Sequence, residues 1–266
     1  MLPDINNVIS IVREASALMV DAHIEIDKKD GFANIVTSAD RNIQNYLCER
    51  LAGLLPDCGF ICEEEDFDTR DGKEYLWIID PIDGTANFSR HIPECCISVA
   101  LKSHDSVLMG VVYNPYHEDL FQAEKGKGAM RNGKSIHVSE RTFADGLLCT
   151  AMSLYNKQYA QICSNIIMDA YMKCNDVRRF GACALEICYL AAGLCDLYFE
   201  YRVMPWDYSA AYLILTEAGG FISDRSGKQL HCDRPTMLVG ANNSENHRRL
   251  VEIVEKYTEE DYYEYR

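Results

Sequence analysis

The stretch YLWIIDPIDGTANF, residues 75 to 88, places a run of apolar residues directly before two carboxylates. Residues 76 to 79 are all apolar, which is typical of a strand buried on both faces. Asp80 and Asp83 follow at once, with Pro81 between them. Because proline has no amide hydrogen, we expect the ladder of hydrogen bonds to stop at Pro81. The sequence therefore predicts a buried strand that ends in an acidic turn.

The acidic turn offers both oxygen ligands and backbone amides. Its two carboxylates and the Ile82 carbonyl can point to one side, and hard oxygens grouped in this way suit Mg²⁺. Gly84 lets a ligand approach the backbone, and free amides after a strand can hold an anion. A surface turn can have the same pattern, so the turn alone does not establish a site.

Two other segments bring carboxylates to the ends of apolar elements. ICEEED, residues 61 to 66, runs from a short strand directly into acidic residues. MPWDYSAAYLILTEAGG, residues 204 to 220, places Asp207 in the first turn of an apolar helix. Taken alone, residues 61 to 66 could be a solvated acidic loop, and Asp207 could simply cap its helix.

The first 60 residues contain two patterns with helical spacing. Asp4 can cap the first helix, and Thr37 or Ser38 the second, with Asp40 in its first turn. We expect residues 28 to 36 to form a loop between them. The inward-facing positions are predicted to be Ile5, Val8, Ile9, Val12, Ala15, Leu18, Met19 and Ala22, then Ile43, Tyr46, Leu47 and Leu51.

The rest of the chain divides into a strand-rich part and an alternating part. Strands are expected at 59–62, 75–80, 97–103, 107–114 and 119–125. Further strands at 147–153, 196–201, 220–224 and 236–242 alternate with helices near 157–172, 182–193, 207–218 and 245–257. No Pro, Ser or Gly-rich linker separates the parts. We predict two tightly joined α/β halves, residues 1–145 and 146–266, with mixed layers of helix and sheet.

A phosphate-loop pattern occurs in GAMRNGKS, residues 128 to 135. Phosphate binding by such a loop needs a helix after it, but SIHVS, residues 135 to 139, has the alternation of a strand. Asn132-Gly133 is a strong hairpin signal. We therefore predict a surface hairpin, and an NTP-binding protein remains a weak alternative.

Composition limits the partners of this chain. A formal net charge of −15 and a pI of about 4.9 argue against binding to nucleic-acid phosphates or anionic membranes. An anionic small substrate remains possible if a cation stands between. No apolar run reaches the about 18 residues of a membrane span, and the first residues do not have the pattern of a signal peptide. We expect a cytoplasmic protein.

Twelve cysteines are scattered along the chain without a C-x-x-C pair. Zinc sites need tighter paired spacing. We expect these cysteines to be small buried side chains in a reducing compartment.

Taken together, the acidic segments resemble the inositol monophosphatase family. NIVTSAD, FICEE, WIIDPIDGTANF and PWDYSAAYLILTEAGG have the order and approximate spacing seen in that family, and the likeness covers roughly residues 5 to 250. The resemblance implies a layered αβαβα sugar-phosphatase fold, Mg²⁺-dependent hydrolysis of phosphomonoesters and a homodimer.

The resemblance also implies a set of metal ligands. Glu63, Asp80 and the Ile82 carbonyl would hold a first ion, and Asp80, Asp83 and Asp207 a second. Glu63 would also help a weaker third ion, which gives about two to three Mg²⁺ ions per site.

Catalytic and substrate-binding residues carry over in the same way. Thr85 with Asp40 would orient and activate the attacking water, next to Glu63. The Gly84 and Thr85 amides would hold phosphate oxygens, and Glu200 would contact a substrate hydroxyl. The implied substrate-binding set is Asp83, Gly84, Thr85, Gly181, Cys183, Glu200 and Asp207.

Simple electrostatics agrees with this assignment. Clustered carboxylates would repel a phosphate dianion, whereas divalent ions cancel that field and can activate water. In-line displacement then depends on positioning and charge, without a nucleophilic side chain. None of the seven histidines lies in these motifs.

Cys62, Cys183 and Ser209 depart from the residues usual in the family. These departures put the shape of the pocket in question rather than metal binding.

The substrate stays open at this stage. Members of the superfamily hydrolyse inositol monophosphate, fructose 1,6-bisphosphate, histidinol phosphate or 3′-phosphorylated nucleotides, and the overall pattern favours the inositol branch. Arg178, Arg179 and Arg202 could meet a second anionic group or be solvated. A regulatory or binding protein with this fold is the alternative outside catalysis, and the complete ligand set favours catalysis.

Overall fold

The computed structural model describes residues 2–20, 26–28, 35–64, 67–104, 106–152 and 157–258. Its helices are α1 (Ile5–Val20), α2 (Ser38–Leu54), α3 (Thr85–Phe88), α4 (Ala160–Tyr171), α5 (Cys183–Ala191), α6 (Pro205–Glu217) and α7 (Ser244–Glu255), with a 3₁₀ turn η2 (Lys157–Tyr159). The first strands are β1 (Ile26–Lys28), β2 (Ile35–Thr37), β3 (Cys58–Cys62), β4 (Tyr75–Asp83), β5 (Cys96–Ser103), β6 (Ser106–Asn114) and β7 (Asp119–Glu124). The remaining strands are β8 (Ala129–Arg131), β9 (Lys134–Ile136), β10 (Leu147–Ala151), β11 (Asp176–Arg178), β12 (Leu197–Val203), β13 (Phe221–Ser223) and β14 (Thr236–Ala241).

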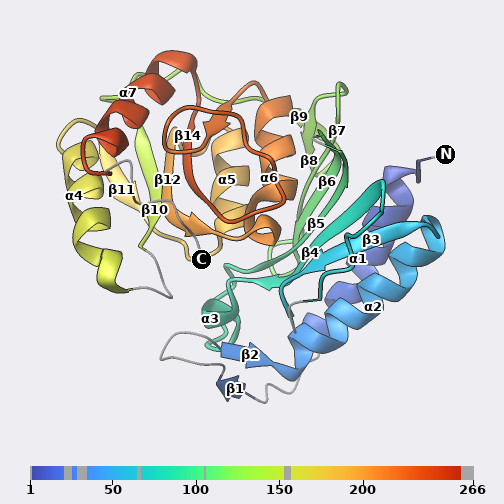
Figure 1. The fold of residues 1–266 in the computed structure, drawn as a ribbon. Helices are drawn as coiled ribbons and strands as arrows, with labels where there is room; N and C mark the ends of the chain where they lie inside the picture. The colour runs from blue at the N-terminus through green and yellow to red at the C-terminus, as the bar shows by residue number, and fades with distance from the viewer. Residues whose placement is uncertain are drawn as a thin grey trace.

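The elements form five layers (Figure 1). A seven-stranded sheet has the order β3-β4-β5-β6-β7-β8-β9, and a five-stranded sheet has the order β11-β10-β12-β14-β13. Helices α1 and α2 cover the outer face of the larger sheet, α5 and α6 lie between the two sheets, and α4 and α7 cover the outer face of the smaller sheet. The layered αβαβα fold is confirmed.

Strand β4 separates two hydrophobic cores. Trp77 and Ile79 point into the core beneath α1 and α2, whereas Ile78 points into the core that contains α5 and α6. All three side chains are at most 1% exposed. Because successive side chains of a strand point to opposite faces, a strand with a core on each face needs an uninterrupted apolar run.

The prediction that the ladder stops at Pro81 was wrong in part. Pairing with β3 does end, at the pair Cys62 and Ile79. Pairing with β5 resumes beyond the proline at Asp83 and Cys96, after an irregularity in the register. A bulge leaves residues unpaired, so a proline can sit inside the strand without costing a ladder bond.

Helix α1 begins as predicted, and one of its inward positions was wrong. The Asp4 carboxylate accepts a hydrogen bond from the Asn6 amide at 2.8 Å. Leu18 is 41% exposed, whereas Ile11 is buried at 4%. Both lie at the edge of the apolar face, where the packing of neighbouring elements decides burial and the spacing does not. Ala22 lies outside the described residues.

The predicted loop at 28–36 was wrong at both ends. Lys28 belongs to β1, and Ile35 belongs to β2 and pairs with it. Strands of three residues are too short to show a recognisable alternation, and β11 was missed for the same reason. Residues 29–34 lie outside the described part of the chain.

The phosphate-loop pattern forms the predicted hairpin. Strands β8 and β9 pair antiparallel, and Arg131 lies opposite Lys134. The two turn residues have positive φ, 50° at Asn132 and 74° at Gly133, as a tight hairpin turn requires. No helix follows, so the loop has no helix N-terminus to hold a phosphate.

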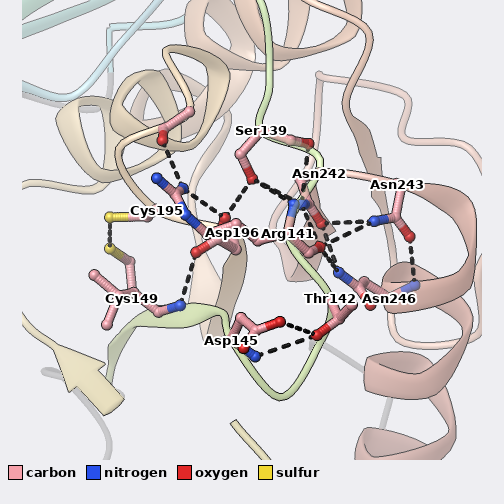
Figure 2. Close-up of polar contacts among 12 residues, drawn as sticks. Ser139, Arg141, Thr142, Asp145, Cys149, Cys195, Asp196, Asn242, Asn243 and Asn246 are labelled. Carbon is pink, nitrogen blue, oxygen red and sulfur yellow. Dashed lines mark hydrogen bonds and ion pairs between the residues drawn. The ribbon is translucent and has the colours of Figure 1, made fainter. Parts of the chain in front are cut away.

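The segment that joins the two sheets is tied down by polar contacts (Figure 2). The Asp196 carboxylate is fully buried and accepts hydrogen bonds from the Ser139 hydroxyl, the Arg141 guanidinium at 3.1 Å and the Leu147 amide at 2.8 Å. The side-chain amide of Asn246 donates to the Arg141 carbonyl at 3.0 Å. Because these contacts fix the segment between the two sheets, it does not need the composition of a flexible linker. The division into halves at residues 145 and 146 stays a prediction.

Nine of the twelve cysteines are buried as predicted, and Cys48, Cys174 and Cys183 are partly buried. All twelve are free thiols, and none of them is exposed. Within the described residues, no helix is both long and apolar enough to cross a bilayer.

Candidate active site

One cavity collects nearly all of the predicted site residues. It has a volume of about 90 Å³ and lies where the end of β4 and the start of α3 meet β12 and the first turns of α5 and α6. Its lining consists of Glu63, Asp80, Ile82, Asp83, Gly84, Thr85, Ala86, Ala151, Arg179, Gly181, Ala182, Cys183, Glu186, Glu200, Arg202 and Asp207. Of the predicted residues, Asp40 is absent from this lining.

The acidic turn is held by its own hydrogen bonds. Asp80 Oδ1 accepts from the Ile82 amide at 2.9 Å, and the Thr85 hydroxyl donates to the Ile82 carbonyl at 3.0 Å. Asp80 is 2% exposed and Asp83 is 7% exposed. The turn therefore presents two nearly buried carboxylates from a fixed backbone.

Gly84 is required by the backbone. Its φ is +89°, a conformation that residues with a Cβ rarely adopt. A Cβ placed there would lie 2.9 Å from the Glu94 carbonyl oxygen and 3.2 Å from the Ala182 Cβ. Neighbouring protein atoms occupy the position where a Cβ would stand, and Gly84 also lines the cavity.

Asp83 joins the turn to helix α5. Its carboxylate oxygens accept hydrogen bonds from the Cys183 amide at 3.1 Å and the Ala184 amide at 2.7 Å. These are N-terminal amides of α5, and the residue before the helix, Ala182, has no side chain that could cap them. Burial raises the pKa of Asp83 to about 6, although these amides act in the opposite direction. Sequence reasoning missed this cap because the partners are about 100 residues apart.

The other three carboxylates of the cluster share one electrostatic environment. Burial raises the pKa of Glu63, Asp80 and Asp207 well above the ordinary values. The charge of Asp207 raises the pKa of Glu63 further, and the charge of Glu63 does the same to Asp80. Carboxylates that disfavour one another's ionised form are the groups that a divalent cation would stabilise.

The arrangement of the acids does not by itself form a metal cage. Among the residues that the structure describes, no three His, Cys, Asp or Glu side chains are grouped so that they could hold an ion as they stand. Asp83 is directed at the α5 amides, and Asp207 accepts from the Met204 amide at 2.7 Å. The donor set has the chemistry that Mg²⁺ requires, and side-chain rotations would have to bring its oxygens together.

Glu200 has partners that the sequence did not predict. The Tyr198 hydroxyl donates to Glu200 Oε2 at 2.6 Å and lies 3.1 Å from the Cys183 sulfur. Burial raises the pKa of Glu200 to about 8. Tyr198 is fully buried two residues before Glu200 on β12. Its position on the same strand face was the signal that could have identified it.

Glu186 and Asn87 fix the turn that contains Gly181. Glu186 Oε1 accepts from the Phe180 amide at 2.6 Å and the Gly181 amide at 2.8 Å. The Asn87 side-chain amide donates to the Phe180 carbonyl at 2.7 Å. Glu186 is 1% exposed, and burial raises its pKa to about 8. A single acid in an otherwise apolar helix was the sequence signal for it.

Asp40 is fully buried in the first turn of α2, as predicted, and the Thr85 hydroxyl donates to the Ile82 carbonyl. The joint function of Asp40 and Thr85 in activating water stays a prediction. The charge of Asp40 still raises the pKa of Glu63 slightly, so Asp40 lies within electrostatic reach of the site.

Of the three departures in sequence, Cys183 lines the cavity, whereas Cys62 and Ser209 are accommodated by packing elsewhere. Cys62 is 1% exposed and lies in the core beneath α1 and α2, with its sulfur 3.7 Å from that of Cys48. The Ser209 hydroxyl donates to the Pro205 carbonyl at 2.6 Å, within α6. Neither residue lines the cavity, so neither alters the pocket shape directly.

The three arginines of interest separate into two groups. Arg179 and Arg202 line the cavity with the acids. Arg178 lines a different pocket and makes an ion pair with Asp176 at 2.5 Å. Adjacent residues of one segment thus face two different environments.

Comparison with known proteins agrees with this site and fold. The profile described as the inositol monophosphatase family matches residues 5–259. A Nus factor SuhB of Salmonella typhimurium is 35% identical over 205 residues, which are 77% of this chain and 76% of that protein. A fructose-1,6-bisphosphatase/inositol-1-monophosphatase of Thermotoga maritima is 34% identical over 88% of both chains. The crystal structure of the extragenic suppressor protein suhB from Bartonella henselae superimposes with a TM-score of 0.87, at 29% identity over 95% of this chain and 98% of that one. The fold, the acid-lined cavity and these likenesses lead to one assignment: the chain belongs to the inositol monophosphatase family.

Proposed function

We propose that this chain is a Mg²⁺-dependent phosphomonoester hydrolase that acts on inositol monophosphate or a closely related sugar phosphate. The observation that carries the proposal is the cavity in which Glu63, Asp80, Asp83 and Asp207 meet. A functional homodimer and a cytoplasmic location are proposed on the family resemblance alone.

The proposed metal ligands are those of the cluster. Glu63, Asp80 and the Ile82 carbonyl would hold one Mg²⁺, and Asp80, Asp83 and Asp207 another. When bound, the ions would cancel the negative field of the cavity and activate the attacking water.

The chain's own groups bind and orient the substrate. Gly84 and Thr85 line the cavity, and their amides would donate to phosphate oxygens. Glu200 is held by Tyr198 and would accept a hydrogen bond from a substrate hydroxyl. The fixed Gly181 turn would shape the pocket for the leaving alcohol.

The test is phosphate release from a panel of phosphomonoesters with Mg²⁺ present. Inositol 1-phosphate, fructose 1,6-bisphosphate and glycerol 2-phosphate would be compared in the wild type and in Asp80→Asn. We expect the substitution to lower kcat about 10³-fold, because it removes a carboxylate shared by both proposed ions. The fold should persist, because Asn fills the same volume.

Asp71→Asn is the matched control, since Asp71 is exposed on a turn outside the cavity. It should leave kcat unchanged. Near-normal turnover in Asp80→Asn would contradict the proposal that Asp80 is shared by the two ions.

A second candidate is a regulatory protein that acts chiefly by binding a partner. Relatives 33–35% identical to this chain are named Nus factor SuhB, which motivates it. The intact acid cluster favours catalysis. Absence of phosphate release from every substrate of the panel, in a folded protein saturated with Mg²⁺, would favour the regulatory candidate.

A further inference from the structure

Two cysteines that are far apart in the chain meet in the core that contains α5 and α6 (Figure 2). The Cys149 thiol, in β10, donates a hydrogen bond to the sulfur of Cys195, and the two sulfur atoms are 2.8 Å apart. Cys195 lies between α5 and β12, 46 residues further along the chain. Cys149 is fully buried, and Cys195 is 3% exposed. The two thiols are therefore paired with each other inside the protein.

The backbone around this thiol pair is held by hydrogen bonds. Asp196, the neighbour of Cys195, is fully buried, and its carboxylate accepts from the Leu147 amide at 2.8 Å. The Asp196 amide in turn donates to the Leu147 carbonyl at 3.0 Å. Beyond these bonds, Cys149 lies opposite Tyr198 in the parallel ladder of β10 and β12. The fixed backbone keeps the two sulfurs together, and they would have to approach by less than about 1 Å to reach the length of a disulfide bond.

Cys195 lines a pocket that is separate from the acid cavity. This pocket has a volume of about 540 Å³, and Leu194 and Arg178 also line it. Neither cysteine of the pair is among the described residues that line the acid cavity. Because a water molecule takes up about 30 Å³, a molecule of the size of hydrogen peroxide fits this pocket easily. A small oxidant can therefore reach Cys195 without entering the acid cavity.

Arg178 places a positive charge beside the thiol pair. It lines the same pocket as Cys195 and lies opposite Cys149 in the ladder of β10 and β11. Asp176 raises the pKa of Arg178 most strongly, and the charges of the two thiolates add to this effect. A cation that interacts with both sulfurs favours the thiolate, which is the reactive form of cysteine.

The hydrogen bond between the thiols distinguishes the two sulfurs. Cys149 is the donor, and this bond together with burial raises the pKa of its thiol. Cys195 is the acceptor, so its sulfur is the one on which a negative charge is stabilised by the neighbouring thiol. Cys195 also lines the pocket, which makes it the sulfur that meets an oxidant first.

We propose that Cys149 and Cys195 are a redox-sensitive pair that a peroxide converts into a disulfide. The Cys195 thiolate attacks one oxygen of hydrogen peroxide, the O–O bond breaks, and hydroxide leaves, so that Cys195 becomes a sulfenic acid. The Cys149 sulfur then displaces the sulfenic oxygen, which forms the S–S bond and releases water. In sum, two thiols lose two electrons and two protons, and one peroxide becomes two water molecules. A dithiol reductant restores both thiols by exchange and is itself oxidised.

The disulfide would tie β10 to the segment that precedes β12. A bond that closes a loop of this length constrains the unfolded chain, and it should raise Tm by about 5–10 °C. Because the inference uses neither the metal ligands nor the substrate, it does not depend on the phosphatase function proposed above.

The test treats the full-length protein with a small excess of hydrogen peroxide, then unfolds it and alkylates the remaining thiols. Two of the twelve cysteines should escape alkylation, and peptide mass analysis should find Cys149 joined to Cys195. Dithiothreitol should restore all twelve thiols and the original Tm. Cys195→Ser should form no such bond and should show no rise in Tm with peroxide.

Cys48→Ser is the matched control, because Cys48 and Cys62 are another close pair, with their sulfurs 3.7 Å apart. It should keep both the bond between Cys149 and Cys195 and the rise in Tm. Arg178→Met makes the test independent of folding at the cysteines, since the Arg178 side chain is largely exposed. It should slow formation of the disulfide about fivefold. Arg179→Met should not, because Arg179 lines the acid cavity instead.

Three results would overturn the proposal. The first is alkylation of all twelve cysteines after treatment with peroxide. The second is a disulfide that joins other cysteines while Cys149 and Cys195 stay reduced. The third is a Cys195→Ser protein whose Tm rises with peroxide as much as that of the wild type, because the stabilisation would then come from elsewhere. Equal rates in Arg178→Met and Arg179→Met would contradict the part assigned to the Arg178 charge.

Discussion

Asp83 has two proposed functions. In the acidic turn it is a proposed metal ligand, and its carboxylate also accepts hydrogen bonds from the first amides of α5, in the other half of the chain. The sequence motif predicted metal binding by Asp83, but only the folded chain shows that Asp83 caps α5. Because the two compete for the same oxygens, binding of a cation at Asp83 would be coupled to the first turn of α5.

Asp83→Ala should destabilise the protein in the absence of metal. Two amides at the start of α5 would lose a charged acceptor, which typically costs about 1.5–3 kcal/mol of unfolding free energy. Asp83→Asn should cost less, because its side-chain oxygen can still accept one of the two bonds. Urea denaturation with EDTA present would measure both. Asp80→Asn is the control, since it relieves repulsion without removing a cap, and an Asp83→Ala protein as stable as wild type would contradict the capping function.

At the scale of elements, periodicity predicted most of the architecture. Strand β4 was recognisable because its apolar run serves the two cores on either side of the larger sheet. The short strands β1, β2 and β11 were missed because three residues carry no periodic signal. The bulge at Pro81 was missed because it depends on the partner strand β5.

The hairpin of β8 and β9 should have no function in phosphate binding. Lys134 is exposed and lies in β9, which no helix follows. Lys134→Ala should therefore leave kcat/KM for inositol 1-phosphate unchanged within about twofold. Titration of wild type with ATP and Mg²⁺ by calorimetry should show no binding at this loop. ATP binding that disappears in Lys134→Ala would revive the NTP-binding alternative.

At the scale of the whole molecule, the site exists only after distant segments meet. Glu63 follows β3, Asp80 lies near the end of β4, Glu200 lies in β12 and Asp207 lies in the first turn of α6. The layered fold brings these ends together at one cavity. The same fold places nearly buried carboxylates close enough to raise one another's pKa. The native state therefore contains repulsion that a bound cation would relieve.

Mg²⁺ should stabilise the folded protein. A ligand that binds the native state alone contributes about 2.7 kcal/mol at a concentration of 100 Kd, which corresponds to a rise in Tm of about 5–10 °C for a chain of this size. Thermal melts with EDTA and with saturating Mg²⁺ would measure it. Asp80→Asn should reduce the shift, and Asp71→Asn should not. An unchanged midpoint in the wild type would count against a metal site in this cavity.

The sequence by itself determined the alternation of helix and strand, the absence of a linker and the identity of the acidic motifs. These features are local, because apolar periodicity and the residues at the ends of strands can be recognised without knowing the partners. The sequence also indicated that Asp80 and Asp83 lie in one acidic turn after a buried strand.

Only the tertiary structure decided how those motifs are used. It placed Asp83 against the amides of α5, Tyr198 against Glu200, and Arg202 in the acid cavity while directing Arg178 elsewhere. It also placed the Thr85 hydroxyl against the Ile82 carbonyl. These choices depend on contacts between segments far apart in the chain, and such contacts leave no periodic trace in the sequence.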